Sequence, residues 1–147
     1  MSWPTMRRMV TRVDLTMDCA DPDRLAEFWK LAAGYVDEPP PTPFATRAEW
    51  VASFEDMEDD GMGGAWLIDP TGVAPRLCLL QVPEPKTAKN RLHMDLQVSG
   101  DGPPAQRWRE VGVEVQRLVS AGATVVAEFA EHHVVMADPE GNEFCVA

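Results

Sequence analysis

The chain has 147 residues, 45% hydrophobic and 25% charged, which is enough to bury a core as a single domain. Its formal net charge of −11 repels phosphate backbones and anionic lipids, and no apolar stretch approaches the roughly 20 residues of a membrane span. We therefore expect neither nucleic acid nor membranes as partners. Three cysteines without paired spacing, and no secretory segment at the N-terminus, predict a cytoplasmic protein.

The first predicted elements are a strand and a helix. Apolar and polar residues alternate over 10–19, with Leu15, Met17 and Cys19 on one face of a strand. A helix then begins at Asp21-Pro22, where the aspartate caps the helix and the proline takes its first position, and Gly34 ends it. We expect its apolar residues Leu25, Phe28 and Trp29 to pack onto a sheet.

The middle of the first half is the least regular part. Tyr35-Val36 starts a short extended segment, and the prolines within 39–43 prevent sheet pairing beyond it. The segment 44–64 is left open between a short helix and strands, with a solvated acidic loop at 55–60. Strands follow at 65–68 and 76–82, joined through the turn Asp69-Pro70-Thr71-Gly72.

The second half repeats this order. A strand over 92–98 is followed by a helix over 106–120, packed through Val115, Leu118 and Val119 and ended by Gly122. Three strands follow at 124–129, 134–137 and 144–146, the last two joined by a second Asp-Pro turn at 138–141. The repeated turn indicates duplication, with an insertion of about 19 residues in the first half. This insertion lies within 37–64, and either a binding loop or a tolerated surface loop explains it.

Three motifs carry a family resemblance: DPDRLAEFW at 21–29, KNRLHMDL at 89–96 and ADPEGNEF at 137–144. In this order they resemble the glyoxalase-like branch of the vicinal-oxygen-chelate superfamily, which includes glyoxalase I, bleomycin-binding proteins and extradiol dioxygenases. The resemblance implies an α+β fold of two βαβββ modules whose curved mixed sheets surround a pocket. We therefore expect one domain over 1–147, with module one at about 10–83 and module two at about 91–147, and a homodimer.

The resemblance also assigns site positions on the first and last strands of each module. These positions fall on Asp14, Gln81, His93 and Cys145, where metal-dependent relatives carry His, Glu or Gln. Because a thiol stands where the family usually has a carboxylate, we expect no tightly bound metal and at most weak zinc binding. If a metal does bind, the expected set is Asp14, Gln81, His93 and Glu143. Asp95 shares a strand face with His93 and completes the expected ligand pocket.

Two functions follow from these positions. The first is a glyoxalase-like protein that holds a small molecule without a tightly bound metal, and the alternative is a divergent metal-dependent lyase or dioxygenase. Whether the protein is an enzyme stays open at this stage. A third reading, a scaffold for protein contacts, rests only on the acidic loop.

The net charge favours neutral or cationic ligands, unless Arg76, Lys86, Lys89 and Arg91 gather into a basic patch. Trp50, Phe54, Trp66 and Trp108 are candidates for a stacking wall, with core packing as the alternative.

Overall fold

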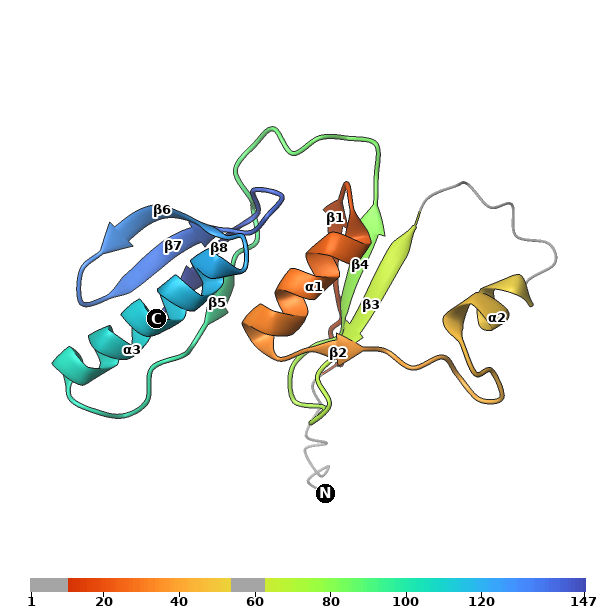
Figure 1. Cartoon of the computed structure of the whole chain (residues 1–147), viewed down its shortest axis with the longest axis horizontal. Coiled ribbons are helices and arrows are strands. Elements are labelled where there is room, and N and C mark those ends of the chain that lie inside the picture. Colours follow the sequence, from red (N-terminus) through yellow and green to blue (C-terminus); the bar gives the residue numbers. More distant parts are fainter. Residues whose placement is uncertain (1–10, 54–62) are drawn as a thin grey trace, which may run out of the picture.

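The computed structural model describes residues 11–53 and 63–147, which form two modules of the same design (Figure 1). Phe54 and the acidic segment 55–60 lie outside the described residues, as does the beginning of the predicted first strand. Module one contains β1 (Leu15–Cys19), α1 (Pro22–Ala33), β2 (Val36–Asp37), α2 (Arg47–Ala52), β3 (Gly64–Ile68) and β4 (Leu77–Gln81). Module two contains β5 (Met94–Leu96), α3 (Pro104–Ser120), β6 (Thr124–Phe129), β7 (His133–Ala137) and β8 (Glu143–Val146).

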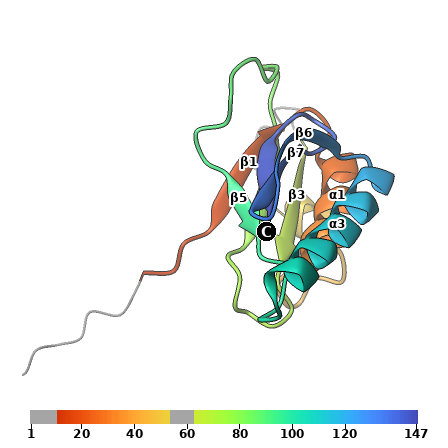
Figure 2. The same cartoon turned by 90° about the vertical axis from the view of Figure 1, so that its left-hand side faces the viewer.

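The two sheets have the same strand order, which confirms the predicted α+β fold of paired βαβββ modules. Sheet one runs β1-β4-β3-β2 and sheet two runs β5-β8-β7-β6. In each sheet the first and last strands of the module pair in parallel, and the remaining pairs are antiparallel. Both long helices lie on one side of the sheets (Figure 2). The opposite sheet faces are therefore left without a long helix.

Local sequence signals explain where the first helix begins and ends. The Asp21 carboxylate accepts a hydrogen bond from the Arg24 amide at 3.0 Å, and Pro22 occupies the first position of α1. Gly34 ends the helix with a φ of 74°, a left-handed conformation that glycine adopts without a side-chain clash. The insertion forms the short helix α2, where Thr46 and Glu49 make a reciprocal capping box.

The core joins both modules around aromatic side chains. Phe28 and Trp29 of α1 pack against Phe144 of β8, with ring centroids 5.9 and 5.3 Å apart. The expected packing residues Leu25, Val115 and Leu118 are buried. Val119 is an exception, because its side chain is 41% exposed on the outer side of α3. A single core cluster therefore contains residues of both modules.

Candidate binding site

Side-chain alternation gives each sheet a helix-facing side and an opposite side, which we call the open face. Leu15, Leu77 and Leu67 stand side by side across sheet one and pack towards α1. Their strand neighbours point the other way, because successive side chains alternate between the faces of a sheet. By strand register, the open face carries Thr16, Asp18, Trp66, Cys78 and Leu80 in sheet one, and Asp95, Phe129, His133, Val135 and Cys145 in sheet two.

The two predicted positions of module one lie on opposite sides of sheet one. Asp14 directly precedes β1, and by strand alternation it belongs to the open face together with Thr16. It is exposed and pairs with the Arg12 Nε at 2.9 Å. Gln81 stands opposite buried Cys19, on the helix-facing side. Its amide accepts from the Gly63 N–H at 2.8 Å and donates to the Ala20 carbonyl at 3.1 Å. The structure therefore does not bring Asp14 and Gln81 together.

In module two the structure brings Asp95 and Cys145 together. They are direct neighbours on β5 and β8, so the thiol lies beside the carboxylate. Burial and this carboxylate raise the pKa of the Cys145 thiol above its ordinary value, which disfavours the thiolate that would bind a metal. His93 lies just before β5, with its Nε2 3.2 Å from the Asn90 carbonyl and 3.5 Å from the Lys89 Nζ.

Glu143, the alternative metal ligand, contacts the segment 82–93 that links the modules, which we call the linker. Its carboxylate accepts from the Lys86 Nζ at 3.1 Å and from the Asn90 amide at 3.0 Å. The Asn90 amide, assisted by Lys86, lowers the pKa of Glu143 to about 2. The carboxylate is therefore ionised at neutral pH and holds the linker against β8.

The residues present do not fit the metal that the fold family implies. Within 11–53 and 63–147, no group of three or more His, Cys, Asp or Glu side chains is placed to hold a metal ion. One predicted ligand faces the helices, one is a protonated thiol and one is bonded to the linker. A divalent cation needs several deprotonated donors at one point, and this arrangement does not supply them.

A cleft of about 590 Å³ lies between the modules. Its wall includes Asp18 of β1, Val82, Lys86, Arg91 and Leu92 of the linker, and Glu140 of the second Asp-Pro turn. Glu140 accepts from the Ala20 amide at 2.5 Å and from the Asp21 amide at 3.0 Å. This contact fixes the turn of module two to the start of α1 and so sets one side of the cleft.

A buried hydrogen bond strengthens the same junction. The Trp29 indole N–H donates to the Asp138 carboxylate at 3.2 Å, and both residues are almost fully buried. Asp138 also accepts from the amide and side chain of Asn142. Burial raises the pKa of Asp138, although these hydrogen bonds act in the opposite direction. The Asp-Pro turn of module two is thus a joint between the modules.

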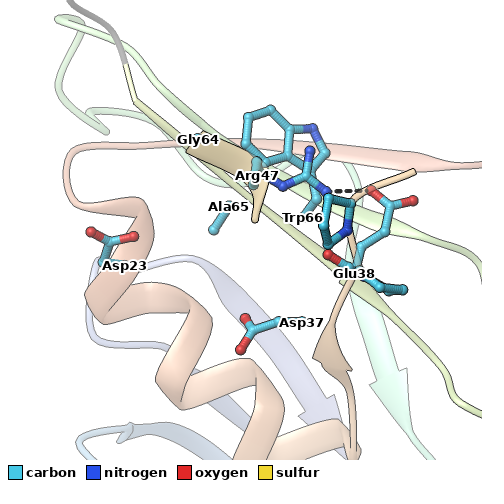
Figure 3. Close-up of a pocket in the computed structure, with 9 residues that line it drawn as sticks. Asp23, Asp37, Glu38, Arg47, Gly64, Ala65 and Trp66 are labelled. Atoms are coloured by element: carbon cyan, nitrogen blue, oxygen red, sulfur yellow. Dashed lines mark hydrogen bonds and ion pairs between the residues drawn. The ribbon is translucent and has the colours of Figure 1, made fainter. Parts of the chain in front are cut away.

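A second polar cluster, the rim cluster, lies at the free edge of sheet one and consists of Glu38, Arg47, Trp66 and Arg76. Figure 3 shows Glu38, Arg47 and Trp66. The Arg47 guanidinium lies 4.3 Å from the Trp66 ring centroid, and its Nη2 donates to Glu38 at 3.0 Å. Gly64 lets the indole lie along the strand, because a Cβ there would come 2.9 Å from the Trp66 ring.

The basic residues predicted to form one patch lie in two places. Arg76 pairs with Glu38 in the rim cluster, whereas Lys86 and Arg91 line the cleft.

Sequence reasoning missed Arg47 and Glu38. The capping signature Thr46-x-x-Glu49 is visible in the sequence and predicts a helix from Arg47 onwards. The partners of Arg47 lie far away in sequence, so no local pattern indicates them. Of the predicted stacking residues, Trp66 and Trp50 flank Arg47, whereas half-buried Trp108 packs against the core.

Comparison with known proteins agrees with this fold. The family model described as a glyoxalase-like domain matches residues 14–147. No curated protein matches the sequence. Among solved structures, the fosfomycin resistance protein FosX from Mesorhizobium loti superposes with a TM-score of 0.63 at 7% identity, covering 95% of this chain and 91% of that one.

Two further structures are similar. FosX from Listeria monocytogenes, in a complex with Mn(II) and dihydroxypropylphosphonic acid, has a TM-score of 0.61 at 10% identity, covering 95% of this chain and 92% of its own. A glyoxalase/bleomycin resistance protein/dioxygenase family enzyme from Burkholderia phytofirmans has a TM-score of 0.58 at 15% identity, covering 91% and 97%. At these identities the likeness concerns the fold alone.

Proposed function

We propose that this chain, which belongs to the glyoxalase-like domain family, holds a small organic molecule in the inter-module cleft and needs no resident metal ion. The cleft itself carries this proposal, because about 590 Å³ is within the range of small-molecule sites. It lies next to the strands where family members place metal ligands, and the corresponding donors here point apart or are already bonded. The ligand is therefore held by shape, apolar contact and individual charges.

The cleft favours a neutral or cationic ligand. Lys86 is neutralised by Glu143, which leaves Arg91 as the main cation facing Asp18, Glu84 and Glu140. The net charge of −11 adds a field that concentrates cations and repels anions. Val82 and Leu92 supply apolar contact. An uncharged or cationic compound with an apolar body fits this wall better than an anionic glutathione conjugate.

We further propose that the protein acts as a cytoplasmic homodimer. Leu80 and Phe129 lie on the open faces with side chains that are 39% and 50% exposed, and a second copy would cover such apolar surface. All three cysteines are free, and thiols persist in this form in a reducing compartment. No helix within the described ranges is long and apolar enough to cross a membrane.

Light scattering at micromolar concentration tests the proposed homodimer, and a monomer alone would contradict it.

A thermal-shift screen tests the binding function. Hydrophobic cations, aromatic natural products and glutathione thiohemiacetals are added to the full chain with and without EDTA. A ligand at about 100 times its Kd stabilises the folded state by about 2.7 kcal/mol. We expect a compound of the first two classes to raise Tm equally in both buffers. Stabilisation by the glutathione compounds alone, together with metal-supplemented turnover, would instead establish the metal-dependent lyase alternative.

A matched pair of variants locates the site of any compound found. Asp18→Asn removes a charge from the cleft wall, whereas Asp101→Asn removes one from an exposed bend before α3. For a cationic ligand we expect Asp18→Asn to weaken binding by about three- to tenfold, because a paired charge near a surface contributes of order 1 kcal/mol. Asp101→Asn leaves the affinity unchanged. Equal affinities in both variants would place the ligand elsewhere.

A further inference from the structure

In the rim cluster, the Arg47 guanidinium is surrounded by groups that commonly bind organic cations. The Arg47 Cζ lies 4.3 Å from the Trp66 ring centroid and 5.2 Å from that of Trp50, so a planar cation stands over two indole rings. The Glu38 carboxylate pairs with its Nη2 at 3.0 Å. An aromatic face beside a carboxylate is an arrangement that recognises organic cations.

The carboxylate does not depend on Arg47 for its position. Arg76 donates to both oxygens of Glu38, from its Nε at 2.8 Å and from its Nη2 at 2.7 Å. The Glu38 amide also donates to the Trp66 carbonyl at 2.8 Å, which ties the residue to the edge of β3. Glu38 and Trp66 therefore keep their relative placement if the Arg47 side chain leaves.

The helix that carries Arg47 lies at the surface, because every residue of α2 is exposed or half-buried. The Arg47 Nη1 is buried and has no hydrogen-bond partner among the described residues. A buried donor without an acceptor is unfavourable, and this cost is removed when the guanidinium moves away.

Space for a larger cation adjoins the cluster. A pocket of about 370 Å³ is bounded by Trp66 and Arg47 on one side and by Asp23 of α1 and Asp37 of β2 on the other (Figure 3). Pro39 and Pro40 complete its wall with apolar surface. The pocket combines apolar walls with Asp23 and with Asp37, whose carboxylate also accepts from the Lys30 Nζ at 3.0 Å, within a protein of net charge −11.

We propose that Trp66 and Glu38 form a binding site for a planar organic cation, which the Arg47 side chain occupies in this structure as an internal competitor. A ligand cation stacks on Trp66, pairs with Glu38 and extends into the pocket beside Asp23 and Asp37. Arg47 and its helix then swing away from the edge of β3. This site lies apart from the inter-module cleft, so it stands or falls independently of the function proposed above.

Titration of the full chain with benzamidine, an aromatic amidinium, tests this site. Benzamide is the neutral control of the same shape, and tryptophan fluorescence and calorimetry report binding. Because Arg47 competes at the high local concentration of an attached group, we expect Arg47→Ala to bind benzamidine at least about tenfold more tightly than wild type. Arg109→Ala, which removes an exposed arginine of α3, should behave as wild type. Benzamide should gain nothing from either change.

A second substitution distinguishes the proposed site from general exposure of the edge. Trp66→Leu in the Arg47→Ala background should abolish the gain, whereas Trp108→Leu on α3 should retain it, with thermal melting confirming that each variant is folded. The proposal is overturned by equal benzamidine affinities in wild type and Arg47→Ala, by absence of binding to both, by an equal gain for benzamide, or by a gain that survives Trp66→Leu.

Discussion

The two Asp-Pro turns begin with the same residues and serve different purposes. In module one, Asp69 is half-buried and accepts hydrogen bonds from the amides of Thr71, Val73 and Ala74, all within its own turn. In module two, Asp138 is buried and accepts from the Trp29 indole of the other module. Duplication has therefore preserved the turn but not its role, since one copy closes a local loop and the other joins the modules.

The largest expected effect on stability comes from replacing Asp138, the buried aspartate of the second turn. Asp138→Ala leaves the Trp29 indole and the Asn142 amide without their acceptor in a buried setting, and we expect a loss of about 3 to 5 kcal/mol in unfolding free energy. Asp69→Ala, the matched change in module one, should cost less because water replaces its contacts. Chemical denaturation measures both, and equal losses would mean that Asp138 is not a joint between the modules.

A smaller effect is expected two positions later in the turn, at Glu140. Glu140 accepts from the amides of Ala20 and Asp21 in module one, whereas Thr71, at the same position of the first turn, bonds only within it through Asp69. Glu140→Gln weakens a charged acceptor at a partly exposed site, with an expected loss of about 1 kcal/mol. Thr71→Val should change stability less. Amide hydrogen exchange at Ala20 and Asp21 should accelerate in Glu140→Gln alone, and unchanged exchange would argue against the contact.

The smallest expected effect is a difference in acid sensitivity. Hydrogen bonds lower the pKa values of Asp69 and Glu143 to about 2, so each stabilises the fold above its unfolded pKa and loses that contribution as pH falls towards 2. Asp138 acts in the opposite sense. Its raised pKa gives a contribution that is complete below the unfolded value of 3.8 and is lost as pH rises through the folded pKa.

Thermal melting between pH 5 and pH 2.5 measures this difference. Wild type should lose Tm over this range, and Glu143→Gln should lose less because its carboxylate contribution is absent throughout. Glu128→Gln, at an exposed position of β6, is the control and should follow wild type. A Glu143→Gln profile parallel to wild type would show that the linker contact with Lys86 and Asn90 does not form.

Much of the fold could be predicted from the sequence because its signals are local. The alternation ending at Cys19, the Asp21-Pro22 helix start and Gly34 each depend on neighbours within a few residues, and the structure confirms all three. Element boundaries were less certain. Helix α3 begins at Pro104, two residues before the predicted start at 106. Gly122, which the sequence predicts to end it, has a φ of 109° and lies one residue beyond the cap Ala121.

The candidate site was harder to predict, for a physical reason. Alternation shows which residues share a face, but not which face is open. Gln81 follows Leu77 and Leu79, and the burial of these leucines places all three on the helix-facing side. The rim cluster and the joint depend on contacts such as Arg47 with Glu38 and Trp29 with Asp138, which only the folded chain brings together.

The two modules also differ at the predicted ligand positions, and our central proposal is that these positions do not form a metal centre. Elemental analysis of the full chain, purified without chelator, tests this most directly, with His93→Ala and His132→Ala as a matched pair. We expect no stoichiometric Mn, Fe or Ni in any of the three proteins, because Gln81, Glu143 and Cys145 are turned away, bonded or protonated. About one equivalent of such a metal, retained in His132→Ala and lost in His93→Ala, would contradict the account.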